Sequence, residues 1–212
     1  MKKIFVIAIV LLMAALVFAA DGQTVLNFMK IGLGGRASAM GEAYSGLAED
    51  VSATYWNPAA LAYNAQTRKQ ELSFYYNKWL ADMTHSSVMY YKKLPFWDGG
   101  VYGFNINHLG MAEWDDTDGE EPAVEAGETT FGFSIANRLK HWGKDESLYR
   151  NLFVGGNVKY GRQNLDGDVH SAFAFDLSLF YEHDSHLKAG LMLQNIFGGK
   201  VEYTTTEWLE IV

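Results

Sequence analysis

Three positions near the start of the chain match the fingerprint of a dinucleotide-binding loop. Gly32, Gly34 and Ala37 have its spacing, and Glu49 or Asp50 lies near the place of its acidic partner. The fingerprint functions only between a strand and a helix of a βαβ unit. Here it follows an apolar N-terminal run and precedes a series of strand-like segments. We therefore predict no nucleotide site and no other cofactor.

Acidic and histidine side chains offer two candidates for metal binding. Residues 112–128 contain eight acids, and positions 116–119 read Asp-Thr-Asp-Gly, a fragment of a calcium loop. Because the rest of that pattern is missing, a solvated external loop is favoured, although divalent ions could link it to lipopolysaccharide. Of the six histidines, His183 and His186 are close in sequence, and two ligands on a turn do not define a site. No metal centre is predicted.

Asp176 is the most interesting single side chain, because it is a lone acid on the small-residue face of a strand-like segment. Pairing with Arg138 or Lys159 across the interior is the favoured explanation, and gating of a ligand is the alternative. The chain has no cysteine, no Gly-x-Ser-x-Gly elbow and no zinc-binding helix motif. The sequence therefore predicts no enzymatic activity.

The elements that must position these side chains show period-two alternation, the pattern of strands with two different faces. In the clearest of them, 171–181, Phe and Leu side chains share one face, and Ala, Asp and Ser share the other. Asp98-Gly99, Asp166-Gly167 and Gly198-Gly199 accept positive φ and predict turns. We predict seven strands, over 70–79, 86–93, 101–108, 129–138, 152–161, 171–181 and 187–195.

The environment of the apolar face decides between a membrane barrel and a soluble sandwich. Segments of about 10 residues suit a tilted membrane crossing, whereas strands of globular proteins usually have about 5–6 residues. The opposite faces carry Gly, Ser, Ala and Asn with few charges, as a lumen would. Tyr76, Tyr91, Tyr160 and Tyr181 stand near strand ends, where an aromatic girdle would lie. The prediction is an all-β, antiparallel transmembrane β-barrel.

The N-terminus is typical of an exported protein. Lys2 and Lys3 precede the apolar run 4–17 and then small residues, which predicts a signal peptide over 1–19 with cleavage after Ala19, or else after Ala20. An uncleaved helical anchor is the alternative, but the run is shorter than the ~20 residues of a spanning helix. No cysteine follows the cut, so a lipid anchor is excluded.

The charge balance excludes one further class of function. The formal net charge is −8, and the sequence contains no basic cluster of the kind that nucleic-acid binders use. We therefore predict no nucleic-acid partner.

Residues 28–62 form a Gly- and Ala-rich stretch that resembles the N-terminal signature of the PorV/PorQ family of outer-membrane proteins, relatives of the FadL fatty-acid transporters. Later segments, 79–82, 175–179 and 193–195, resemble that family's landmarks in the same order. The resemblance implies that 20–65 is a hatch that plugs a barrel formed by 66–212. Its hatch or gating candidates are Gly32, Gly34, Arg36, Asn57, Pro58 and Ala59.

The resemblance leaves two functions open. Likeness to PorV and PorQ implies a non-enzymatic accessory of type IX protein secretion at the cell surface, with secretion-system proteins as partners. Likeness to FadL implies passive transport of hydrophobic molecules such as long-chain fatty acids. Outer-membrane lipid and lipopolysaccharide are expected neighbours in both cases.

Asn57 and Pro58 also have a physical interpretation of their own. Pro58 restricts Asn57 to extended geometry, and the Asn57 side chain can bond to nearby backbone, so the pair predicts a defined corner. This corner either turns the chain into the first strand, or belongs to a gated plug, or does both.

The strand count raises the question of completeness. A FadL-like barrel has about fourteen strands, which at ~10 residues each need about 140 residues. We expect this chain to be the N-terminal half to two-thirds of a longer barrel, or a family member truncated at its C-terminus, with two unpaired edges that favour dimerisation, aggregation or failed insertion. The alternative is a compact barrel in which 200–212 forms an eighth strand and pairs with 71–79.

Overall fold

The fold was analysed in a computed structural model, which describes residues 29, 31–79, 82–110, 126–139, 151–165, 168–183 and 187–196. Several predictions concern parts of the chain outside these residues. They are the signal peptide over 1–19, the turns at 166–167 and 198–199, His186, most of the acidic stretch 112–128 and the eighth strand over 200–212.

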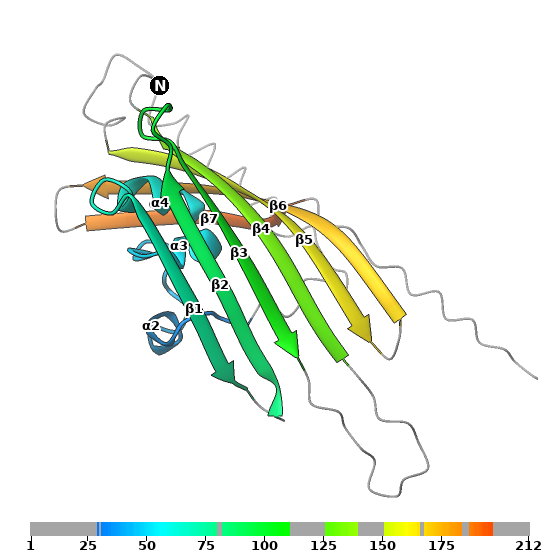
Figure 1. The fold of residues 1–212 in the computed structure, drawn as a ribbon. Helices are drawn as coiled ribbons and strands as arrows, with labels where there is room; N and C mark the ends of the chain where they lie inside the picture. The colour runs from blue at the N-terminus through cyan, green and yellow to red at the C-terminus, as the bar shows by residue number, and fades with distance from the viewer. Residues whose placement is uncertain are drawn as a thin grey trace, which may run out of the picture.

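The described part of the chain is one antiparallel sheet of seven strands, joined in sequence order (Figure 1). The predicted number of strands and the all-β, antiparallel class are confirmed. Six strands extend beyond their predicted ends, and β4, β5 and β6 do so by at least three residues at one end, because the alternation of apolar and polar side chains marks only the middle of each strand. The strands are β1 (Gln70–Lys78), β2 (Thr84–Lys93), β3 (Val101–Gly110), β4 (Ala126–Arg138), β5 (Leu152–Leu165), β6 (Asp168–His183) and β7 (Leu187–Ile196).

The sheet is curved but not closed, and β1 and β7 form its two edges (Figure 1). We call the end where β1 begins and β2 finishes the proximal end, and the opposite one the distal end. The turn between β2 and β3 lies at the proximal end, and Gly99 has the positive φ, 74°, that the sequence predicted there. No helix in the described residues is long and apolar enough to cross a membrane.

The two faces of the sheet differ as the alternation predicted. On the outer face Phe74 and Phe173 are 73% and 60% exposed, whereas on the inner face Asn105 and Ala174 are buried. Apolar side chains that lack a protein partner on this face suit a lipid environment. The prediction of a barrel-like wall with an apolar exterior and a polar interior is therefore confirmed.

One aromatic position was assigned to the wrong face. Tyr91 is fully buried on the inner face, where its hydroxyl donates to Arg68 O at 3.1 Å. The outward position belongs to Tyr90, whose ring lies 6.4 Å from that of Tyr102 on β3. Two adjacent tyrosines at a strand end satisfy the alternation in either register, which is why the sequence left this choice ambiguous.

A helical segment, residues 31–65, covers part of the inner face of the sheet (Figure 1). Its helices are short, and α4 contacts β3, β4, β5 and β6. Small side chains let the α4 backbone approach the wall, and they share one buried core with aromatic side chains of the strands. The helices are α2 (Gly35–Ala39), α3 (Ala53–Trp56) and α4 (Pro58–Asn64). The core includes Leu33, Ala59, Ala60, Leu61, Val101, Ala136, Phe153 and Phe180.

Candidate functional site

The corner predicted at Asn57 and Pro58 is present, between α3 and α4. Asn57 is extended, with φ −166° and ψ 91°, and Pro58 is the first residue of α4, where its missing N–H costs no hydrogen bond. The Asn57 side-chain oxygen accepts from Ala59 N at 3.1 Å, so Asn57 is the N-cap of the helix. This local geometry is the one expected from the sequence.

The same corner is fastened to the wall, which the sequence did not reveal. The Asn57 amide donates to Ser45 O at 2.8 Å and to Leu179 O on β6 at 3.1 Å. Ala59 N also donates to the Ser178 hydroxyl at 2.9 Å, and that hydroxyl bonds to a carbonyl of β5. Asn57 therefore joins the helical segment to β6 while it caps α4.

Glycines in three strands allow the helical segment to lie directly on the wall. A Cβ at Gly155 would lie 2.7 Å from Pro58 C, and one at Gly190 would lie 2.7 Å from Gly46 N. On β3, a Cβ at Gly103 would lie 2.8 Å from the Thr54 methyl group. A side chain at any of these positions would push the segment away, so the close seating depends on them.

We expect Asn57→Ala to destabilise the folded chain by about 2 kcal/mol, from the lost cap and the lost bonds to Ser45 and Leu179. Chemical unfolding in detergent micelles measures this change. Asn77→Ala is the control, because the structure shows no side-chain bond for that β1 residue. Equal stability of the two variants would show that the corner does not hold the segment.

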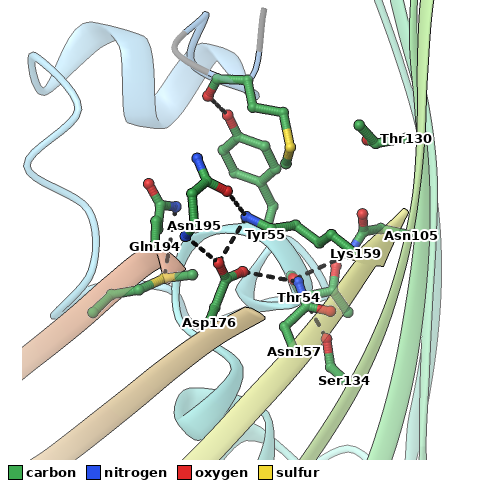
Figure 2. Close-up of polar contacts among 12 residues, drawn as sticks. Thr54, Tyr55, Asn105, Thr130, Ser134, Asn157, Lys159, Asp176, Gln194 and Asn195 are labelled. Carbon is green, nitrogen blue, oxygen red and sulfur yellow. Dashed lines mark hydrogen bonds and ion pairs between the residues drawn. The ribbon is translucent and has the colours of Figure 1, made fainter. Parts of the chain in front are cut away.

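A second part of the site is a buried ion pair on the inner wall (Figure 2). Lys159 Nζ on β5 lies 2.7 Å from Asp176 Oδ1 on β6, and both side chains are 1% exposed. Asn157 donates to Asp176 Oδ2 at 3.1 Å, and Asn195 N donates to Oδ1 at 2.9 Å. Lys159 also donates to the Asn195 side chain at 2.6 Å. These bonds satisfy both charges away from bulk water.

The structure distinguishes between the two partners predicted for Asp176. The carboxylate pairs with Lys159, as one alternative expected. Arg138 lies at the proximal end of β4, where its guanidinium is 5.5 Å from the centre of the Phe153 ring, so the alternative pairing with Asp176 is wrong. The sequence did not identify Asn157 and Asn195 as partners of this ion pair. The alternation of strand residues shows which side chains face the interior, but not which of them bind a charged group.

A ladder of neutral polar side chains continues the inner wall from β5 towards β2. Asn105 donates to Thr54 O of α3 at 3.1 Å, and Asn107 donates to Asn105 at 2.8 Å and to Thr130 at 3.1 Å. Ser87 on β2 donates to Asn107 at 2.7 Å. The helical segment thus rests on side chains that are already hydrogen-bonded to one another.

The remaining predicted positions lie in and around α2. Glu42 accepts from Gly32 N at 3.1 Å, and Gly34 has φ 95° as the residue before α2. Arg36 lies 5.7 Å from the centre of the Tyr44 ring. A hollow of about 220 Å³ separates this region from β1 and β2, and Gly34 and Arg36 line it. Gly32 and the Asn57 corner are not part of this hollow.

A further set of contacts joins the helical segment to the proximal ends of β6 and β7. Lys188 Nζ lies 2.6 Å from Glu49 Oε1 and 4.8 Å from the centre of the Tyr63 ring. The Tyr63 hydroxyl donates to Glu182 at 2.9 Å. The hydrogen bond from Lys188 holds the pKa of Glu49 below its usual value. This contact therefore persists at neutral pH and weakens as pH falls through that lowered pKa.

The site as a whole is a fastening between an internal segment and a wall, built from the Asn57 cap, glycine contacts and the Lys188–Glu49 ion pair, with a buried ion pair inside the wall beside it. In the described residues, no three His, Asp or Glu side chains gather where they could hold a metal ion. The family model described as type IX secretion system protein PorV matches residues 21–207 of this chain. No curated protein matched the chain.

Proposed function

The chain belongs to the PorV family of outer-membrane proteins associated with type IX secretion, and we propose that it is a non-enzymatic accessory of that secretion at the cell surface. The observation that carries the proposal is the family match, which extends over both the helical segment and the sheet. In this proposal, 66–212 contribute the barrel wall, and residues 20–65 are a hatch that seals its lumen.

The geometry supports a static role for the hatch. It is fixed by Asn57 to β6, by Lys188 of β7 to Glu49, and by Asn105 of β3 to α3. A plug held at three strands suits a protein that offers a rigid surface to secretion partners while it keeps the membrane sealed.

Removal of the protein from its source cell tests this role. We expect type IX cargo to accumulate in the periplasm, because its export lacks an accessory, while uptake of long-chain fatty acids stays unchanged. Both are measured on the same cultures, by surface labelling of cargo and by uptake of a labelled fatty acid. Normal cargo display together with lost fatty-acid uptake would refute the proposal in favour of the transporter.

Passive transport of hydrophobic molecules is not supported by the family match. The hollow beside α2 also differs from an apolar ligand pocket, because Arg36, Asp50 and Glu71 contribute to its lining. Burial of such side chains against an alkyl chain would cost their hydration.

We propose that export removes residues 1–19, as the charged and apolar N-terminal run suggests. The expected mature protein begins at Ala20, or at Asp21, in the outer-membrane fraction. N-terminal sequencing of that fraction tests this, and retention of Met1 in the inner membrane would contradict it.

Deletion of residues 28–60 tests the sealing role. The truncated protein should still assemble and should give a higher conductance in planar bilayers, because the deleted segment covers the inner wall. The matched control is Gln66→Ala, just beyond the last helix, which should conduct like the unmodified protein. An assembled deletion variant with unchanged conductance would show that the segment is not a plug.

A further inference from the structure

A basic surface lies at the proximal end of β1 and β2. We define the basic rim as Lys69, Lys92 and Lys93 together with Phe96 and Trp97 of the β2–β3 turn. Lys93 N donates to Lys69 O at 2.7 Å, so the two strand ends that carry these lysines are directly bonded. The rim brings together residues from both sides of a hairpin, which separates them in the sequence.

The basic rim has more positive than negative charge, because the β2–β3 turn adds one acid, Asp98, to its three lysines. Glu71 is the nearest acid on β1, and its carboxylate is bound by Arg68 at 3.1 Å. Within the part of the chain that the structure describes, no ion pair joins a carboxylate to Lys69, Lys92 or Lys93. Three such ammonium groups stand out in a chain whose net charge is −8.

Aromatic side chains accompany these lysines. Phe96 is 83% exposed, and Trp97 is exposed beside it. On the outer face of the same end, Tyr90 and Tyr102 are diagonal neighbours on adjacent strands, with ring centres 6.4 Å apart. Aromatic rings combined with lysines at the end of an apolar band are typical of the interface between hydrocarbon and head groups.

The distal end is more acidic, although Lys78 at the end of β1 also lies there. Asp82 lies between β1 and β2 there, Asp168 begins β6, and Glu128 is the third residue of β4. The balance of charge therefore shifts from basic to acidic along the axis of the wall. An anionic lipid layer without bridging cations is attracted to the proximal end and repelled by the distal one.

We propose that the basic rim binds the phosphate head groups of anionic phospholipids in the leaflet at the proximal end. The lysines contact the phosphates, and Phe96 and Trp97 insert among the glycerol and upper acyl groups. This inference rests on the outer-membrane placement in the proposed function, but not on a role in secretion. It assigns the phospholipid leaflet to the proximal end and the lipopolysaccharide leaflet to the distal end.

Lipid retention by the purified full chain tests the proposal. Lys92→Gln is compared with Lys78→Gln, because both lysines are exposed on the outer face, at the proximal end of β2 and the distal end of β1. The detergent-solubilised proteins are mixed with phosphatidylglycerol, phosphatidylcholine or lipopolysaccharide, and bound lipid is counted by native mass spectrometry. We expect Lys92→Gln to weaken phosphatidylglycerol binding about fivefold. Lys78→Gln should change it less than twofold.

A second arm separates charge from apolar insertion. Lys69→Gln combined with Lys92→Gln and Lys93→Gln should abolish the preference for phosphatidylglycerol over phosphatidylcholine, while Phe96→Ser should weaken the binding of both lipids. Circular dichroism confirms that each variant is folded. Any of three results would overturn the proposal. They are equal effects of Lys78→Gln and Lys92→Gln on phosphatidylglycerol binding, an unchanged preference of the triple variant for phosphatidylglycerol, and loss of lipopolysaccharide binding alone. The display of secreted cargo on the cell surface is measured separately, and it tests the role in secretion independently of lipid binding.

Discussion

Replacement of Asp176 by leucine should lower the free energy of unfolding by about 3–5 kcal/mol, because it leaves the Lys159 ammonium group buried without its counter-charge. Lys159 is 1% exposed, so its ammonium group is held away from bulk water. The Asn157 amide and the Asn195 N–H lose their acceptor in the same step. Equilibrium unfolding in urea, with the protein folded in lipid vesicles, measures the change.

The double variant Asp176→Leu with Lys159→Met is the control. Both charges are then absent, and an apolar pair of similar volume is often as stable as a buried ion pair. We expect the double variant to recover most of the loss. If both variants were equally destabilised, the cost would come from packing around Asp176 and the ion pair would not be its cause.

Replacement of Phe133 by arginine should cost about 2–4 kcal/mol, the range for a charge on the lipid face near the bilayer midplane. Phe133 is 53% exposed in the middle of β4, with Phe104 and Val158 as its neighbours on β3 and β5. Because this side chain is half exposed on the outer face, a large cost must come from the surrounding lipid.

Two matched variants make this test specific. Phe133→Leu keeps an apolar side chain and should cost far less than Phe133→Arg. Phe96→Arg places the same charge on the exposed proximal turn, where the expected cost is at most about 1 kcal/mol. Refolding yield and urea unfolding in vesicles measure all three. An arginine at position 133 that is as well tolerated as leucine would mean that β4 does not face lipid.

The faces of the strands could be predicted from the sequence because a strand has an exact repeat of two. Phe173 and Ala174 are adjacent in sequence, yet the first is exposed on the outer face and the second is buried on the inner one, as the alternation indicated. The prediction was wrong at Tyr91, where neighbouring tyrosines provide no contrast. The Asn57 corner was also predictable, since its cap and proline act within two residues.

The fastening of the helical segment could not be predicted, because its partners are distant in the sequence. Asn57 bonds to the carbonyl of Leu179, and the backbone at Ser45 and Gly46 approaches Gly190. A glycine in a strand has many causes, and nothing at Gly155 or Gly190 identifies the segment that lies against it. The same holds for the basic rim, because only the pairing of β1 with β2 brings Lys69 next to Lys92 and Lys93.

The contacts of the helical segment also determine when it can fold. Its bonds to β6 and β7 join residues separated by 122, 119 and 139 positions, although the segment precedes every strand in the chain. Contacts of such long separation form late, because loop closure must come first. Leu61 and Trp56, which are buried in the folded chain, must therefore stay protected from aggregation until β6 has joined the sheet. The helical segment, which precedes the strands of the sheet in sequence, is in this sense the last to reach its place.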